Sequence, residues 1–330
     1  MSEIVIIGAT VVGTATGKGF AAHGHPVRFV DVDPARVEAL RADGYQASGE
    51  IELPETPAFI FLTLPTPNVG HRYDLDAFTT GTREVGDALK RAEAFHTVVV
   101  RSTVPPGTCE GRVGPLLQEQ SGKLVDEGFG LCSNPEFLRA ASAVEDFLFP
   151  WMTVIGSRSR ATVERMRNLF APLGGELRTF DDPAAAEMVK CSHNLYNAAK
   201  ISFWNEMWLV ARRMGLPADD IAATVARSSE GSVNPGYGIR GGAPYGGACL
   251  PKDTKGFLGF TGDLGIDMPL LDAVVEVNER MIRAASAKDP GDPGDLGDLT
   301  DLEDLGDLAG ERVISLTDGA PGDGAVSGAR

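Results

Sequence analysis

The sequence predicts an α/β protein in which a doubly wound, mainly parallel sheet is followed by a long central helix and a small helical domain. Three observations support this fold class. Short apolar runs alternate with helical stretches over residues 1–182, which is typical of parallel strands joined by crossover helices. A helical pattern without proline then follows Pro183. Residues 289–330 finally change to a tail rich in Asp, Gly and Leu.

The first strand and the turn after it carry a dinucleotide-binding pattern. Residues 3–8 (EIVIIG) form an apolar run that ends in glycine, and a helix is expected to follow. Gly8 and Gly13 occupy the first and third glycines of a GxGxxG motif, whereas Thr10 stands at the second. In this motif the glycines allow a tight turn, close approach of a pyrophosphate and close packing of helix on strand.

An acidic residue ends the second strand, VRFVDVD. Asp31 lies 23 positions after Gly8, and an acid at about this distance binds the adenosine ribose hydroxyls and repels a 2′-phosphate. Strand, glycine turn, helix, strand and acid in this order favour a Rossmann-type domain that binds NAD rather than NADP, in preference to an α/β domain without a nucleotide. The residues expected to bind the cofactor are Gly8, Val11, Val12, Gly13, Asp31, Arg36, Thr66, Thr103 and Lys252.

Two further apolar runs end in loops rich in Thr, Pro and Gly. AFIFLTL (58–64) precedes Thr66, and TVVVRS (97–102) precedes Thr103. Loops at the carboxyl ends of such strands form the ligand crevice of a doubly wound sheet, although a threonine there is also a common helix cap. The other elements expected are a helix at about 75–94, a strand at 128–133, a helix starting with NPEFLRAASAVEDF (134–147), a strand at 152–156, a helix at 159–171 and a strand at 176–180.

The second domain, residues 183–288, is expected to be helical. Its first helix should cover about 183–213, which exceeds the mean helix length several-fold. This helix is apolar on more than one face and must therefore be buried against another domain or subunit, so we expect a homodimer. Shorter helices are expected at 217–228, about 253–264 and 269–287.

The stretch GGAPYGGACLPKD (241–253) is the most suggestive of chemistry. Glycines before Cys249 let the backbone pass close to a ligand. Lys252 and Asp253 bring charge near the thiol, and a nearby cation favours the reactive thiolate. A lone cysteine is more often a small core residue, but these neighbours favour a nucleophile.

Composition excludes several classes of protein. The net charge of −16 argues against nucleic acid as a partner, and no apolar run reaches the ~20 residues needed to span a membrane. The N-terminus enters a strand-like run without a basic leader, which indicates a cytoplasmic protein. Four cysteines without a CxxC pair predict neither a disulfide framework nor a metal site.

The acidic tail at 289–330 carries nine of the sixteen excess negative charges. Gly, Pro and like charges at this density do not stabilise an ordered core, so the tail is expected to be disordered or loosely attached. Within it, ERVISL (311–316) is the only strand-like run.

Four segments, RSTVPPGT, NPEFLR, AEMVK and CLPKD, make the chain resemble the UDP-glucose/GDP-mannose 6-dehydrogenases over about residues 3–285. HTVVVRSTVPPGT, FPWMTVIG and NAAKISFWNE are most similar to the GDP-mannose branch. The resemblance implies an N-terminal Rossmann domain, a central helix that dimerises and a C-terminal nucleotide-binding domain. It also implies oxidation of a sugar C6 alcohol to a carboxylate with two molecules of NAD.

The same resemblance implies roles for individual residues. Cys249 would be the nucleophile, and Lys190 and Asn194, at i and i+4 on one helix face, would hold the C6 oxygen. Asp253 would position a water or Lys190, while Glu136 would act as acid and base in thioester hydrolysis. The other residues implied are Thr103, which would hold the water, and Asn205, Tyr237, Arg240 and Gly242, which would bind substrate together with Lys190 and Asn194.

The chain also departs from the family pattern. Thr10 replaces a fingerprint glycine, and Ala140 replaces a second glutamate after NPEFLR. LAGERVISLTDG resembles the first strand of the C-terminal domain, the rest of which we expect to be missing. Three alternatives therefore stay open: a smaller phosphorylated sugar or nucleotide alcohol as substrate, oxidation that stops at the aldehyde, and a non-catalytic nucleotide-binding protein.

Overall fold

The computed structural model describes residues 1–228, 234, 238, 242–247 and 249–286. The chain divides into two compact units, Met1–Lys200 and Ile201–Arg330, and each is described by itself. The strand-like run at 311–316 and the proposed substrate residues Tyr237 and Arg240 lie outside the described residues.

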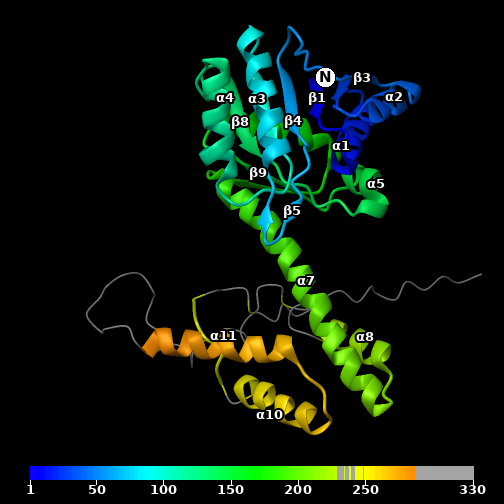
Figure 1. Ribbon diagram of the computed structural model, residues 1–330, viewed down its shortest axis with the longest axis vertical. Coiled ribbons are helices and arrows are strands. Elements are labelled where there is room, and N and C mark those ends of the chain that lie inside the picture. Colours follow the sequence, from blue (N-terminus) through cyan, green and yellow to red (C-terminus); the bar gives the residue numbers. More distant parts are fainter. Residues whose placement is uncertain (229–233, 235–237, 239–241, 248, 287–330) are drawn as a thin grey trace, which may run out of the picture. The chain divides into compact units, whose positions relative to one another are not determined.

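An eight-stranded sheet forms the centre of the first unit, in the order β10-β9-β8-β7-β4-β1-β2-β3 (Figure 1). Its strands are β1 (Glu3–Ile7), β2 (Val27–Val30), β3 (Gln46–Ser48), β4 (Ala58–Leu62), β7 (His96–Val100), β8 (Phe129–Ser133), β9 (Met152–Gly156) and β10 (Glu176–Phe180). All neighbours pair in parallel except β8 and β9, which pair antiparallel at Ser133 and Gly156. The chain leaves β1 toward β2 and returns to β4 on its other side, which creates the crevice of a doubly wound sheet.

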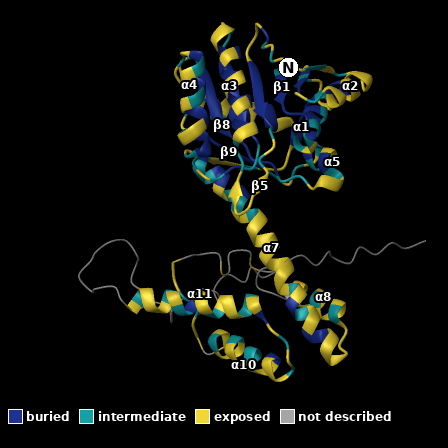
Figure 2. Ribbon diagram, viewed as in Figure 1, coloured by how far each residue is buried: buried dark blue, intermediate teal, exposed yellow. Residues whose placement is uncertain are grey.

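Helices cover both faces of this sheet, as Figure 1 shows for α3 and α4 on one side and α1 and α5 on the other. Burial confirms the arrangement, because the strands are the most deeply buried part of the unit (Figure 2). The helices are α1 (Val11–Ala22), α2 (Pro34–Ala42), α3 (Asp76–Arg91), α4 (Gly114–Ser121), α5 (Ala143–Leu148) and α6 (Arg160–Phe170). Sequence reasoning missed α2, β3 and α4. It also missed several short elements: the hairpin β5 (Asn68–Val69) with β6 (Arg72–Tyr73), a π-helical turn at Cys109–Val113 and 3₁₀ turns at Ala140–Ser142 and Ala171–Leu173.

Two hydrophobic cores follow from the alternation of side chains along each strand. Ile4 belongs to the core that contains Phe20 of α1 and Phe147 of α5. Its neighbour Val5 belongs to the opposite core, with Phe78 of α3. The strands are therefore apolar at successive positions, as expected for a sheet buried on both faces. The predicted α/β fold class is confirmed.

The segment 134–139 corrects one expectation, since the helix predicted to start at Asn134 begins only at Ala143. The Asn134 side chain accepts from Arg101 Nη1 at 2.7 Å and donates to the Val154 carbonyl at 2.7 Å. The Glu136 carboxylate accepts from the backbone N–H of Leu138 at 2.5 Å. Polar side chains that bind nearby backbone groups compete in this way with helix formation.

Helix α7 (Pro183–Met214) runs for 32 residues from the first unit into the second. The second unit continues with α8 (Ala218–Ser228), α10 (Leu250–Asp263) and α11 (Pro269–Ser286). The carboxylate of Glu206 in α7 accepts from the backbone N–H of Leu270 at 2.6 Å and so caps the start of α11. Among the described residues, no helix combines the length and apolar character needed to cross a membrane.

Candidate active site

The glycine turn after β1 has the geometry that its two glycines predict. Gly8 has φ of +96°, and a side chain there would also lie 3.0 Å from the Thr63 carbonyl oxygen. A Cβ on Gly13 would lie only 2.1 Å from the Gly8 carbonyl oxygen. Both positions therefore require glycine, one for its backbone conformation and the other for close packing.

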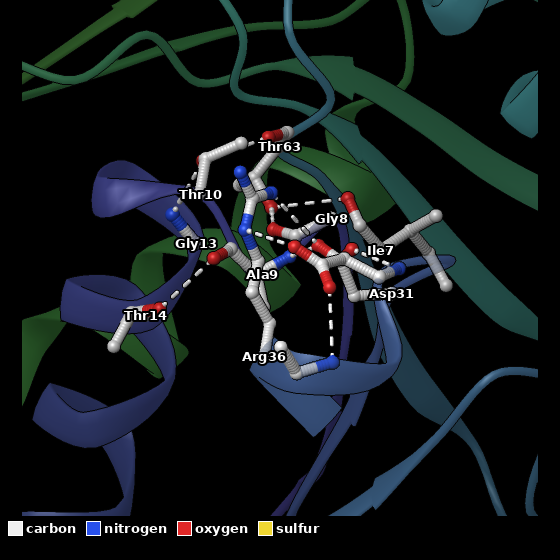
Figure 3. A network of polar contacts seen from close by, with 11 residues as sticks. Ile7, Gly8, Ala9, Thr10, Gly13, Thr14, Asp31, Arg36 and Thr63 are labelled. Atoms are coloured by element: carbon white, nitrogen blue, oxygen red, sulfur yellow. Dashed lines mark hydrogen bonds and ion pairs between the residues drawn. The ribbon is translucent and has the colours of Figure 1, made fainter. Parts of the chain in front are cut away.

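Thr10 fits the second fingerprint position without strain. Its backbone is extended, with φ −67° and ψ 178°, so no glycine is needed there. Its hydroxyl accepts from Gly13 N at 3.2 Å and donates to the Thr63 carbonyl at 2.9 Å (Figure 3). Thr10 is thus the N-cap of α1 and connects the turn to the end of β4.

Thr63, which sequence reasoning missed, connects the same loops from the other side. Its hydroxyl lies 2.7 Å from the Gly8 carbonyl oxygen and 3.0 Å from that of Ile7. A threonine one residue after a strand is the signal that could have identified it, because Thr66 and Thr103 were selected on a similar position.

Asp31 is buried at the carboxyl end of β2, where the cofactor prediction placed it. Its Oδ2 accepts from the N–H of Ala9 at 2.6 Å and faces Arg36 Nη1 at 3.4 Å, while Oδ1 accepts from Asp33 N at 2.9 Å (Figure 3). A carboxylate offers about four acceptor sites. One site remains for a ribose hydroxyl, and the half-exposed Arg36 can move to release another.

Two cavities adjoin this turn and share Arg36. One, of about 670 Å³, lies between the start of α1, at Thr10 and Val11, and the segment 140–145. The other, of about 270 Å³, is lined by Gly8, Asp31 and the end of β4. Exposed Val11 and half-buried Val12 stand in the first turn of α1, whose N–H groups favour an anion. The residues present therefore fit a dinucleotide, with its pyrophosphate at α1 and a ribose at Asp31.

Thr66 and Thr103 lie on neighbouring loops and are bonded to each other. The Thr66 hydroxyl donates to the Thr103 carbonyl at 2.7 Å. Beside them, the Ser102 hydroxyl donates to the Leu64 carbonyl at 2.7 Å. These bonds hold the loops after β4 and β7 together at the carboxyl edge of the sheet.

Lys190 and Glu136 form a buried ion pair, with 3.0 Å between Nζ and Oε1 and side chains only 7% and 10% exposed. Lys190 Nζ also lies 5.5 Å from the centre of the Phe137 ring. Glu136 comes from the loop after β8, and Lys190 comes from the second turn of α7. Asn194 follows one turn later on α7 and is exposed. Because α7 is uninterrupted from Pro183 to Met214, Lys190 and Asn194 lie on one face of it, as their spacing predicts.

The remaining candidates lie in the second unit. Cys249 is exposed and immediately precedes α10, and its side chain caps no backbone group. Lys252 and Asp253 follow in the first turn, where their side chains pair with each other at 2.9 Å. Asn205 lies on α7, and Gly242 has φ of +97°. The ammonium of Lys252, which we expected near the Cys249 thiol, thus pairs with the Asp253 carboxylate.

The first unit has the fold and the turn of a nucleotide-dependent dehydrogenase. Residues 44–174 match the NAD binding domain of the UDP-glucose/GDP-mannose dehydrogenase family, and residues 184–280 match its central domain. The chain belongs to this family and is an NAD-dependent oxidoreductase. The predicted family and the predicted cofactor, NAD, are both confirmed.

Relatives from both branches of the family are similar to the chain. A UDP-glucose 6-dehydrogenase of Haloferax volcanii is 33% identical over 303 residues, covering 84% of this chain and 69% of the relative. A GDP-mannose 6-dehydrogenase of Pseudomonas aeruginosa is 32% identical over 308 residues, covering 86% and 70%. The crystal structure of a ternary complex of GDP-mannose dehydrogenase from Pseudomonas aeruginosa superimposes with a TM-score of 0.78 at 29% identity, covering 87% and 71%.

Asp31→Asn is expected to shift cofactor preference toward NADP. The amide keeps an acceptor for Ala9 N but loses the charge that repels a 2′-phosphate, and Arg36 then faces no carboxylate at that position. We expect the dissociation constant for NADH to rise about tenfold and the preference for NADPH over NADH to rise about 100-fold. Fluorescence titration with both cofactors measures this, with Asp43→Asn, at the exposed ion pair with Lys18, as control. An unchanged ratio would contradict the role given to Asp31.

Proposed function

We propose that the chain oxidises the C6 primary alcohol of a nucleotide-linked hexose, GDP-mannose-like or UDP-glucose-like, to a carboxylate through Cys249. The observation that carries the proposal is the buried pair of Lys190 and Glu136 beside the NAD-binding sheet. A buried ammonium can stabilise the negative charge that forms on the alcohol oxygen, and a buried carboxylate can take a proton from water in the later hydrolysis. The names of the relatives, UDP-glucose 6-dehydrogenase and GDP-mannose 6-dehydrogenase, support the same class of substrate.

The first oxidation converts the alcohol into an aldehyde. NAD, held by the turn Gly8–Gly13 and by Asp31, supplies the acceptor for a hydride in each oxidation. Lys190 and Asn194 hold the C6 oxygen, and the ammonium stabilises its negative charge while the alcohol proton passes to a water positioned by Asp253. The C–H bond breaks as the carbonyl forms, so the products are the aldehyde, one NADH and one proton.

The second oxidation takes place on a covalent intermediate. The Cys249 thiolate adds to the aldehyde carbon, and the oxygen takes a proton to give a thiohemiacetal. Cys249 stands at the start of α10, where backbone N–H groups favour a negative charge. Loss of a second hydride and of the hydroxyl proton gives a thioester. Glu136 then deprotonates a water held by Thr103, which attacks the thioester, so the C–S bond breaks and the carboxylate leaves.

Substrate binding and dimerisation complete the proposal. We assign the residues that bind substrate as Lys190, Asn194, Asn205, Tyr237, Arg240 and Gly242. We further propose a homodimer through the 183–213 helix, because α7 exposes large apolar side chains that a monomer would leave in water. These are Leu195, Tyr196, Ile201, Phe203, Trp208 and Leu209.

A substrate panel tests the proposal. The protein is incubated with NAD and with GDP-mannose, UDP-glucose, hexose phosphates or nucleotides, and both NADH and the oxidised product are quantified. We expect two NADH and one carboxylate per nucleotide sugar. One NADH with an aldehyde product would establish oxidation that stops early, and turnover of a sugar phosphate alone would establish the smaller substrate. Folded protein that binds NADH but oxidises nothing would identify a non-catalytic member.

A further inference from the structure

Glu187 is a buried carboxylate that the reaction steps above do not use. Its side chain lies on α7, three residues before Lys190, and the residue is only 2% exposed. Oε2 accepts from the backbone N–H of Gly107 at 2.5 Å, and Oε1 accepts from that of Cys109 at 2.8 Å. Hydrogen bonds from two amides to the two oxygens of one carboxylate are strong and fix its orientation.

The segment that Glu187 binds is attached to the cofactor edge at its other end. Residues 102–109 begin with the bonds from Ser102 to the Leu64 carbonyl and from Thr66 to the Thr103 carbonyl. They end at the amides that Glu187 binds. The loop after β7 is therefore held by the loop after β4 on one side and by α7 on the other.

Helix α7 is in turn fixed by two buried charges from adjacent turns. Glu187 binds the loop after β7, whereas Lys190 binds Glu136 in the loop after β8 at 3.0 Å. Residues at i and i+3 lie on the same side of a helix. The register of α7 against these two loops is thus set by groups three residues apart.

The hydrogen bonds of Glu187 favour a carboxylate over an apolar or a neutral amide side chain at this position. In the described residues Glu187 has no cation within salt-bridge distance, and its partners are backbone N–H groups. Burying a carboxylate without a cation is unfavourable. An apolar side chain, however, would leave the Gly107 and Cys109 amides without an acceptor, and a glutamine would offer one acceptor oxygen for the two amides. Hydrogen bonds that fix the position of the loop after β7 therefore offset the unfavourable burial of the Glu187 carboxylate.

We propose that Glu187 is a positioning residue that fixes the Thr103 loop to α7 and thereby aligns Thr103 with Lys190 and Glu136. The catalytic part of this inference rests on the proposed function, whereas the attachment of the loop does not. The ionised form of Glu187 is the one that accepts from both amides. Protonation places a hydrogen on one oxygen and removes an acceptor from the loop.

Glu187 changes its protonation state near neutral pH. Burial raises its pKa to about 7, against the lowering effect of hydrogen bonds from the amides of Cys109, Gly107 and Thr108, and the charge of Glu110 raises it further. Burial also raises the pKa of the thiols of Cys109 and Cys191, which face Glu187, so both are neutral in this range. The loop is therefore held by both oxygens of Glu187 above about pH 7, and by the remaining carbonyl oxygen alone below it.

Protonation of Glu187 weakens its hold on the loop but increases the free energy of unfolding of the protein. Because the pKa of folded Glu187 lies above the ordinary value of 4.5, its contribution to stability is complete below pH 4.5 and is lost as pH rises through about 7. In Glu187→Gln the side chain does not ionise, so this loss of stability at high pH is absent. We therefore expect the variant to melt no earlier than the wild type at pH 8, although its loop is less well held.

The test uses Glu187→Gln, with Glu110→Gln as the matched control. Glu110 lies in the adjacent π-helical turn and pairs with Arg158 at 2.8 Å, so its loss removes a neighbouring charge without touching the two amides. Hydrogen exchange of the Gly107 and Cys109 amides, NADH formation from GDP-mannose and UDP-glucose, and melting at pH 8 are measured for each protein.

For Glu187→Gln we expect amide exchange about tenfold faster and kcat lower by about 10- to 100-fold, with KM for NAD within about twofold. The decline of wild-type kcat below pH 7 should disappear from the variant. Glu110→Gln should leave amide exchange and kcat at pH 8 within about twofold, and it should move the decline of kcat to lower pH, because the charge of Glu110 raises the pKa of Glu187. Unchanged exchange would overturn the inference, and so would faster exchange with an unchanged kcat. If the wild type oxidises neither nucleotide sugar, the proposed function fails, and exchange of the Gly107 and Cys109 amides still decides whether Glu187 holds the loop.

Discussion

Cys249→Ala is expected to abolish carboxylate formation, with a fall in kcat for the complete reaction of at least about 10³-fold. Alanine cannot form the thiohemiacetal, so the second oxidation has no covalent substrate. The first oxidation does not need the thiol, and a variant that still binds substrate should release aldehyde at no more than one NADH per sugar. Cys249→Ser should behave similarly, because an unactivated hydroxyl is a much weaker nucleophile than a thiolate.

The measurement combines NADH yield with intact-mass spectrometry. Wild-type protein quenched during turnover should carry an acyl group on Cys249, and both variants should lack it. Cys191→Ser is the matched control, because that half-buried thiol donates to the Val104 carbonyl at 3.6 Å and is hydrogen-bonded to Tyr73, contacts that serine can retain. Its kcat should stay within about threefold of wild type. Two NADH per substrate from Cys249→Ala would contradict the covalent mechanism.

The parts of the fold predicted from sequence are those that depend on local patterns. Apolar runs identify strands because the sheet is buried on both faces, and the proline-free stretch identifies α7 within one or two residues. Gly8, Gly13 and Asp31 are predictable because their spacing along the chain reflects one strand–helix–strand unit. The positive φ of Gly8, the close packing at Gly13 and the place of Asp31 after β2 agree with that unit, while their binding of NAD stays a prediction.

The parts that could not be predicted depend on contacts between distant segments. Glu187 lies 78 positions from the Cys109 amide that it binds, and Thr63 lies 55 positions from the Gly8 carbonyl. Nothing near either residue in sequence indicates such a partner. The false helix at Asn134 has the same origin, because its pattern is helical while Arg101, 33 positions away, binds its side chain.

Lys190→Met is expected to lower both kcat and the free energy of unfolding. The ion pair with Glu136 stabilises the fold, and the ammonium also acts in the proposed reaction. The substitution leaves the carboxylate of Glu136 buried without its cation, and breaking a buried pair by removing one partner costs about 3–5 kcal/mol of unfolding free energy. The C6 oxygen also loses the charge that stabilises it. We therefore expect kcat to fall by at least about 10²-fold.

The double variant Lys190→Met with Glu136→Gln should recover much of the stability but none of the activity. A neutral amide at 136 no longer needs a cation, so most of the desolvation cost is removed. The ammonium that stabilises the C6 oxygen and the base for thioester hydrolysis are both absent, however. Glu136→Gln alone should slow thioester hydrolysis and so accumulate the acyl group on Cys249.

Urea unfolding and intact-mass spectrometry of the two single variants and the double variant measure these effects. Lys18→Met provides the comparison, since its pair with Asp43 is partly exposed, at 29% and 55%, and should contribute no more than about 1 kcal/mol. If the double variant were as unstable as Lys190→Met, the lost stability would come from the contact of the ammonium with the Phe137 ring, 5.5 Å away, and not from an unpaired charge. Full activity in any of the three would remove the residue or residues substituted in that variant from the mechanism.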